Sequence, residues 1–179
     1  MEMNDLKDLL VDNLKDLYSA EKQILAARNK VAKAIENEQL REMFDMHMKE
    51  TEEQKARLEQ ILERMGERAG GKKCKGMEGL IEENKELLEE DAEPEVLDAG
   101  LIVGLQKIEH YEIAGYGSAV TFAKLLGDQE SADLLAKTLD EEERTDKKLS
   151  EIAESAINIQ AAEGDEDMDE DEEEDEDEE

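Results

Sequence analysis

Apolar residues recur every three or four positions along four long stretches of the chain, a spacing that places side chains on one face of an α-helix. The first stretch follows Asn4 and extends to about Glu36, and the second follows Asn37 and extends to about Met65. Asparagine side chains can cap helix N-termini. Because the two stretches nearly adjoin, we expect two antiparallel neighbouring helices.

The second half of the chain repeats this arrangement. Pro94 suits the first turn of a third long helix, which extends to about Leu126 and ends at Gly127. Asp128 can cap a fourth long helix that extends to about Gln160. The pattern therefore predicts a second helical pair.

The connection between the two pairs is long. Glycine and lysine residues mark its first part as a loop, and residues 77–90 read as a short helix. For Cys74, in the loop, we favour a free thiol without a role over one activated by its basic neighbours. The topology predicts an all-α, ferritin-like antiparallel four-helix bundle with a short extra helix in the crossover between helices 2 and 3.

Composition supports a helical, cytoplasmic protein. The chain has no tryptophan and few aromatic residues, so its core must consist mainly of Leu, Ile, Val, Ala and Met. It has one proline among many Leu, Ala, Glu and Lys residues, a composition that favours helices. Its single cysteine rules out an internal disulfide and fits a reducing compartment. We find no signal peptide and no apolar run near the roughly 20 residues of a membrane span.

The formal net charge of −31 changes the picture of the surface and of the partners. Residues 163–179 hold 15 acidic residues and no basic one, and we predict a disordered acidic tail there, after a bundle over residues 1–162. Without that tail 38 acidic residues still face 22 basic ones, a charge of −16. Such a surface repels nucleic acids and anionic membranes. It suggests a halophilic, high-salt cytoplasm, and an ordinary acidic protein is the alternative.

Carboxylates also occupy apolar stripes near the middle of every long helix. A buried, isolated carboxylate is very unfavourable, and antiparallel packing would bring these positions to one layer. Four helices with inward carboxylates therefore suggest a shared cation, although any single one could fall on a stripe by chance. The stripe positions are Glu21, Glu50, Glu109, Glu112, Glu142 and Asp146.

Carboxylates and imidazole suit a pair of iron or manganese ions in a helical bundle. On the second helix Glu50 is flanked by His47 and Gln54, both of which could bind metal. Neither Glu50 nor Glu142 is followed by histidine at the third position, so the nitrogen ligand stays open. His47 is either a ligand or a core histidine bonded to a carboxylate, and His110 lies a step off the inward face.

At these positions the sequence resembles the YciE/YciF family of ferritin-like proteins. The resemblance covers about residues 4–160 in order and spacing and leaves out the acidic tail. It rests on residues 16–23 (DLYSAEKQ), 47–51 (HMKET) with Gln54, 76–83 (GMEGLIEE), 109–116 (EHYEIAGY) and 139–146 (LDEEERTD).

The resemblance implies a ferritin-like bundle with an extra short helix, a homodimer, a two-metal site and a link to stress responses. It supports six carboxylates as ligands, with His47 and Gln54 as neighbours: Glu21, Glu50, Glu109, Glu112, Glu142 and Asp146. We expect a metal-binding protein that handles peroxide or dioxygen. Iron sequestration and a non-catalytic helical interaction protein are the alternatives.

Overall fold

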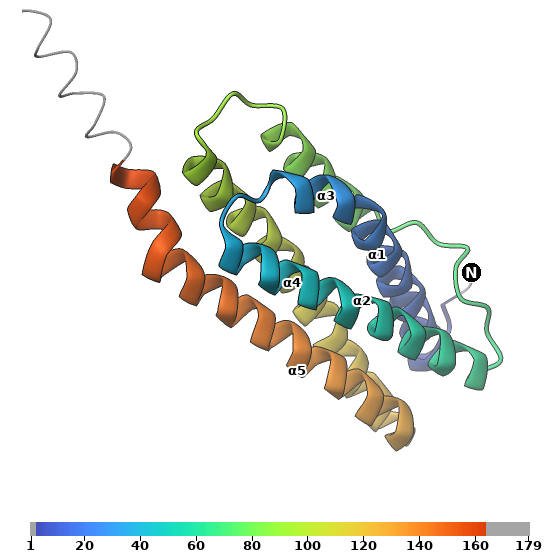
Figure 1. Ribbon diagram of the computed structural model, residues 1–179. Coiled ribbons are helices and arrows are strands. Elements are labelled where there is room, and N and C mark those ends of the chain that lie inside the picture. Colours follow the sequence, from blue (N-terminus) through green and yellow to red (C-terminus); the bar gives the residue numbers. More distant parts are fainter. Residues whose placement is uncertain (1–2, 164–179) are drawn as a thin grey trace, which may run out of the picture.

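The computed structural model describes residues 3–163, and within that range all regular structure is helical (Figure 1). No helix there has the length and apolar run needed to cross a membrane. The predicted acidic tail lies outside the described range, apart from residue 163. The helices are α1 (Leu6–Ala34), α2 (Glu38–Arg64), α3 (Lys75–Leu87), α4 (Pro94–Leu125) and α5 (Gln129–Ile152), followed by the π-helical turn η1 (Ala153–Ile157).

The ends of the helices follow the local chemistry of the sequence. Asn37 caps α2 and Asp128 caps α5 as predicted, each by accepting a backbone N–H with its side chain. The prediction for α1 was wrong by one residue, because Asp5 rather than Asn4 accepts the backbone N–H of Asp8, at 2.9 Å. Pro94 opens α4 as predicted.

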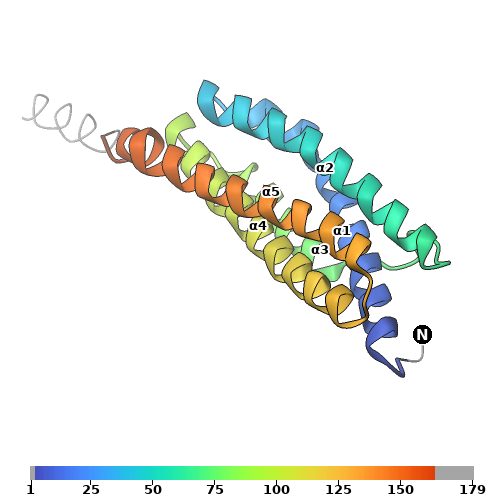
Figure 2. The same cartoon turned by 90° about the horizontal axis from the view of Figure 1, so that it is seen from below.

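The four long helices contact one another in a ring (Figures 1 and 2). Helix α1 contacts α2 and α4, and α5 contacts the same two helices. The short helix α3 lies against α1 and α4 on the outside of this ring. The inward faces of α1, α2, α4 and α5 therefore meet along a common core.

That core consists of two apolar clusters, and a polar segment separates them on every long helix. On α1, Leu17 belongs to one cluster and Ile24 to the other, and on α4 Tyr116 and Ile108 are divided in the same way. These polar segments lie at residues 21, 47–54, 109–112 and 141–145, and each contains at least one buried polar or charged side chain. Four of the six predicted carboxylates, Glu21, Glu109, Glu112 and Glu142, are buried in these segments.

Close contacts fasten α3 to the bundle. A Cβ atom on Gly104 of α4 would lie 1.6 Å from the side-chain oxygen of Asn84, so only glycine allows this approach. Cys74 is fully buried, and its Sγ caps α3 by accepting the N–H of Met77. Cys74 is a free cysteine, as predicted, and burial raises the pKa of its thiol rather than lowering it. The expectation that it has no role was wrong, because Cys74 caps the start of α3.

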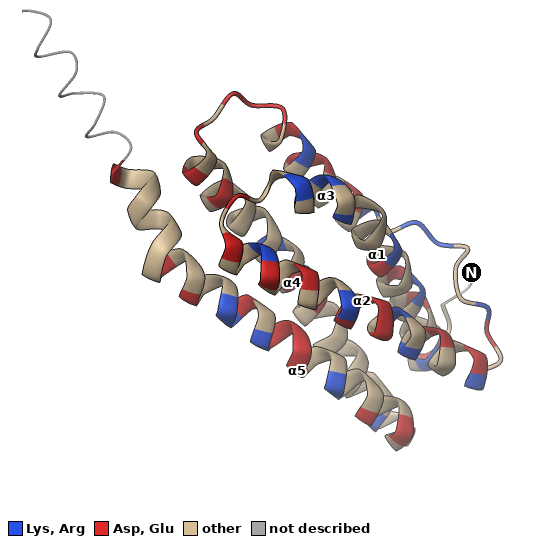
Figure 3. Ribbon diagram, in the orientation of Figure 1, with Lys and Arg blue, Asp and Glu red and all other residues tan. Residues whose placement is uncertain are grey.

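Acidic residues are spread over the helices rather than gathered on one of them (Figure 3). The body of the protein is therefore acidic in its own right, as its composition predicts.

Candidate metal centre

Five side chains of ligand type meet in the polar layer between the two apolar clusters, and each is at most 3% exposed. They come from all four long helices: Glu21 from α1, His47 from α2, Glu109 and Glu112 from α4, and Glu142 from α5.

Three of these side chains form the tightest group. His47 Nε2 lies 3.2 Å from Glu109 Oε1 and 4.0 Å from Glu142 Oε2. One ligand atom from each residue lies within 4.8 Å of the other two. A single cation could therefore contact all three helices at this point.

Neighbouring side chains orient the group from behind. The hydroxyl of Tyr116 donates a hydrogen bond to Glu21 Oε1, and Gln54 Nε2 donates to Glu142 Oε1. On the far side of the imidazole, Thr145 Oγ1 lies 3.3 Å from His47 Nδ1. One polar atom each of Glu21, Glu142 and His47 is thus held by a neighbouring side chain, and the second polar atom of each faces the layer.

Those other atoms have no hydrogen-bond partner within the described residues, although they are buried. Buried polar atoms of this kind are rare in native proteins and need an explanation. They are Glu21 Oε2, His47 Nε2, Gln54 Oε1, Glu109 Oε2, Glu112 Oε1 and Glu142 Oε2.

Burial and mutual repulsion make the carboxyl groups poor acids. Burial raises the pKa of Glu21 to about 8, and repulsion from Glu142 adds to this effect. Burial likewise raises the pKa of Glu109 to about 8. The pKa values of Glu112 and Glu142 also lie well above the usual range, first through burial and then through the charges of Glu21 and Glu109 respectively. The layer must therefore hold protons or bind cations.

Two of the predicted carboxylates lie at the edge of this layer. Glu50 is partly exposed and accepts a hydrogen bond from Arg144 at 2.9 Å. Asp146 is partly exposed and accepts from Gln106 at 3.1 Å. His110 Nε2 lies 3.4 Å from Asp146, and its side chain is 67% exposed. The inward lines of α2 and α5 pass through Thr51 and Thr145 instead, so these charges face outward contacts.

Sequence reasoning missed another buried carboxylate, that of Glu141. It is 6% exposed, and Arg57 donates two hydrogen bonds to it at 2.5 and 2.9 Å. Burial opposes ionisation of Glu141, but the hydrogen bonds and charge of Arg57 outweigh burial and lower its pKa. The sequence signal was an arginine beside Leu58 on the apolar stripe of α2. Gln54 bridges the two sites, because it also donates to Glu141 at 3.2 Å.

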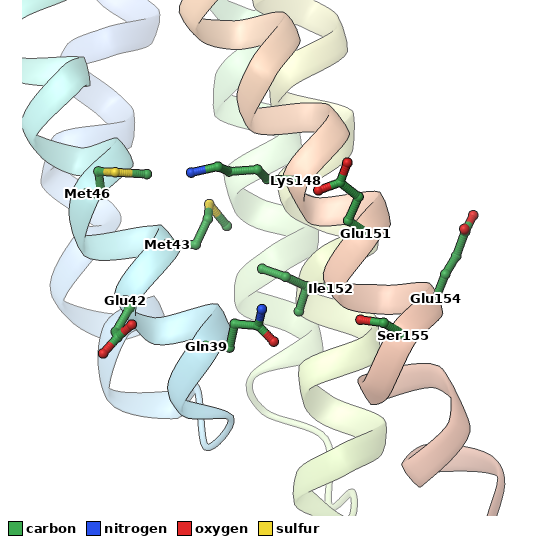
Figure 4. A pocket seen from close by; sticks show the side chains of 9 residues that line it. All are labelled: Gln39, Glu42, Met43, Met46, Lys148, Glu151, Ile152, Glu154 and Ser155. Atoms are coloured by element: carbon green, nitrogen blue, oxygen red, sulfur yellow. The ribbon is translucent and has the colours of Figure 1, made fainter.

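A wide groove of about 880 Å³ lies elsewhere, between the start of α2 and the end of α5 (Figure 4). Met43 and Ile152 point toward one another across it, and Lys148 reaches toward Met46. None of the five ligand-type residues of the buried layer lines this groove. The groove and the layer are therefore separate features of the molecule.

Comparison with known proteins places the chain in a family. Residues 5–162 match the domain of unknown function DUF892. Protein YciF of Escherichia coli K12 is 44% identical over 162 residues, which are 90% of this chain and 98% of YciF.

Solved structures agree with the sequence match. The crystal structure of the E. coli stress protein YciF has a TM-score of 0.83 at 44% identity, over 87% of this chain and 99% of YciF. YcfI of Rhodopseudomonas palustris has a TM-score of 0.80 at 36% identity, over 83% and 95% of the two chains. A protein of Xanthomonas campestris reaches 0.74 at 25% identity, over 90% and 99%. The resemblance seen in the sequence is confirmed: the chain belongs to the DUF892 family and is a homologue of the stress protein YciF.

Proposed function

We propose that this chain is a ferritin-like protein that binds two iron or manganese ions in its buried carboxylate layer. One observation carries the proposal: each of the five ligand-type residues has a buried atom without a hydrogen-bond partner within the described residues, and His47, Glu109 and Glu142 lie close enough together to hold one ion. None of the ion pairs in that part of the chain brings a lysine or arginine to Glu21, Glu109, Glu112 or Glu142. Bound cations would remove both the lost hydrogen bonds and the repulsion between carboxylates.

The donor set fits these metals. His47, Glu109 and Glu142 would form one set of ligands, and Glu21 with Glu112 would form a second. Hard carboxylate oxygens with one imidazole suit iron and manganese. Glu50 and Asp146 remain proposed as further ligands, and Gln54 as a neighbour of the site. The two edge carboxylates would first have to release Arg144 and Gln106.

The proposed chemistry is reaction with peroxide or dioxygen in a stress response. Bound iron or manganese would supply the redox chemistry. YciF is described as a stress protein, and its likeness to this chain supports the proposal. The chain itself contributes two apolar clusters that keep bulk water from the layer, and Tyr116 holds one oxygen of Glu21 in place.

The architecture proposed with this function is a ferritin-like bundle over residues 1–162, with α3 as the extra helix, followed by an acidic tail. A homodimer is part of the proposal. Sedimentation of the full-length chain would test it, and particles far larger than a dimer would favour iron sequestration instead.

Metal analysis is the central test. Full-length protein is loaded with Fe(II) or Mn(II), desalted and measured by mass spectrometry of the elements, and we expect about two ions per chain. Glu142→Gln should reduce the metal content to at most half. Glu143→Gln is the matched control, because Glu143 is the next residue of α5 and is exposed. A folded wild-type protein that stays metal-free with both ions would overturn the proposal.

Peroxide consumption by the loaded protein then tests the reaction separately. We expect the rate to follow the metal content across wild type, Glu142→Gln and Glu143→Gln. If the fully loaded protein consumes peroxide no faster than free metal, the proposed reaction is contradicted, whereas the proposal of metal binding is not.

A further inference from the structure

A separate cavity of about 260 Å³ opens between α1 and α3. Its interior is apolar: Ile24 and Val31 of α1, Phe44 of α2, Ile81 of α3, Leu88 just after α3, and Leu105 of α4 line it. Five of these belong to a single apolar cluster at the α3 side of the bundle, and Leu88 packs against that cluster. The cavity is therefore a pocket in the core that is accessible between two helices.

The interior of the cavity lies beside the carboxylate layer. Three of its residues are each one helical turn from a residue of that layer, a spacing that places both on the same helix face. The pairs are Ile24 and Glu21, Phe44 and His47, and Leu105 and Glu109. A molecule in the cavity would thus have one end deep in the core beside this layer, where burial disfavours an ionised group.

The entrance has the opposite charge. Arg28, Lys30 and Lys85 line it, and an adjoining groove of about 350 Å³ shares Lys30 and Lys85 and adds Lys33. Arg28 and Lys85 pair with Glu52 and Glu82 respectively, and Lys30 forms no ion pair within residues 3–163. Glu89 also lines the adjoining groove, so four cationic side chains face three carboxylates at the entrance and leave an excess of one positive charge, in a chain of net charge −31.

Asn84 also lines the cavity, and the residue is 7% exposed. Its side-chain atoms are not among the completely buried polar atoms that lack a partner, so the amide remains in contact with solvent. Close packing against Gly104 prevents the side chain from moving toward α4. The amide therefore offers a polar contact at the wall of the cavity for a water molecule or a ligand atom.

We propose that this cavity binds a linear aliphatic carboxylate. The hydrocarbon chain lies against Ile24, Phe44 and Leu105, and the carboxylate sits at the entrance beside Lys30 and Lys85. An apolar interior with a few polar groups at fixed positions is the usual form of a small-molecule site. The buried apolar inner end and the lysines at the entrance select this orientation of an anionic head group.

Isothermal titration calorimetry on the full-length chain tests the proposal, with sodium octanoate, sodium decanoate and 1-octanol as probes. Each methylene that enters the cavity should tighten binding about fourfold, so decanoate should bind on the order of tenfold more tightly than octanoate. Octanol lacks the charged head and should bind at least fivefold more weakly than octanoate. No heat with either carboxylate, or equal affinity for octanol, would overturn the proposal.

Variants test the position of the two ends. Lys30→Glu should weaken octanoate binding about fivefold or more, whereas Lys7→Glu, on an equally exposed lysine of α1 outside the cavity, should leave it unchanged. Ala27→Phe fills the cavity and should abolish binding, with circular dichroism confirming the fold. Equal effects of Lys30→Glu and Lys7→Glu would place the carboxylate elsewhere and contradict the proposal.

This proposal fails or survives independently of the metal proposal. Octanoate should bind with the same affinity to metal-free and manganese-loaded protein, and Glu142→Gln should leave that affinity unchanged. Binding that requires metal would show that the carboxylate contacts the metal layer, which would overturn the proposed orientation.

Discussion

Glu141 and Glu142 are consecutive residues of α5, both buried, yet their surroundings are opposite. Glu141 accepts two hydrogen bonds from Arg57, and its pKa is lowered. Glu142 faces Glu109 and His47, keeps one oxygen without a partner, and its pKa is raised. Within residues 3–163 the protein supplies an arginine to the first carboxylate and neither a lysine nor an arginine to the second.

This difference distinguishes a structural buried charge from a candidate binding site. A buried ion pair needs both members, since removal of one leaves an uncompensated charge. A group of buried carboxylates without a cationic partner has its charge compensated only by protons or by bound ions. The ring of four helices therefore contains one site that is complete and one that we propose is completed by metal.

The largest expected effect is that of pH on the metal-free protein. The folded pKa of about 8 for Glu21 and Glu109 exceeds that of an unfolded glutamate, so the folded state binds more protons between about pH 5 and 8. Stability is then fully present below the unfolded pKa and lost as pH rises through the folded pKa. Each retained proton corresponds to about 1.4 kcal/mol per pH unit.

Urea denaturation of chelator-treated protein at several pH values measures this slope. Glu142→Gln should reduce the slope, and saturating manganese should reverse it, because metal binding favours the ionised carboxylates. A metal-free protein that gains stability from pH 5 to 8 would contradict the assignment of opposite surroundings to Glu141 and Glu142.

Removal of the cation from the complete site should have the next largest effect. Arg57→Met leaves the Glu141 carboxylate without its buried cation and should lower the free energy of unfolding by about 3–5 kcal/mol. Arg144→Met is the control, because its partner Glu50 is partly exposed and the pair should contribute at most about 1 kcal/mol. Equal losses in the two variants at pH 7 would show that Glu141 needs no buried cation.

Neutral isosteres at the two neighbouring positions should act in opposite directions. At pH 8, Glu142→Gln should raise the free energy of unfolding of metal-free protein by about 1–3 kcal/mol, because it removes a carboxyl group that is hard to ionise. Glu141→Gln should lower it by about 1–3 kcal/mol, since Arg57 loses a charged acceptor. The same sign for both changes, in urea titrations, would remove the distinction.

The smallest effect should come from the bridge between the sites. Gln54→Leu removes hydrogen bonds to both Glu141 and Glu142 and should cost about 1 kcal/mol. It should also raise the pKa of Glu142 further, which nuclear magnetic resonance of the labelled side chain can follow. An unchanged Glu142 pKa would mean that Gln54 does not couple the two sites.

Apolar periodicity was sufficient to predict the helices, because each long helix buries one continuous stripe. The short helix α3 was placed two residues late, since its N-cap is a cysteine, a residue without a strong capping preference. The burial of Cys74 could not be foreseen, because its contacts join segments far apart in sequence: its backbone N–H donates to the Ser19 hydroxyl, and its thiol contacts the Tyr111 hydroxyl.

The candidate site shows where periodicity loses resolution. On α2 a stripe can step from His47 to Gln54 through Glu50 or through Thr51, and both lines satisfy steps of three and four residues. The structure buries Thr51 and turns Glu50 toward Arg144. In a chain with 42% charged residues, a carboxylate at the edge of a stripe looks the same as one inside it.

The pairing of Arg57 with Glu141 depends on which faces of α2 and α5 meet. Arg57 and Glu141 lie more than 80 residues apart, and a single sequence does not show which faces of their two helices pack together. An arginine beside an apolar stripe nevertheless predicts a buried carboxylate partner, although it does not say which carboxylate that is.

Cys74 is the only thiol in the chain, and it is sealed beneath the first turn of α3. A reagent such as iodoacetamide can reach it only when that turn opens. The rate of alkylation under native conditions therefore reports the free energy of local opening of this segment, apart from global unfolding. The alkylation rate of Cys74 therefore measures how often the first turn of α3, the helix that lines the cavity, opens.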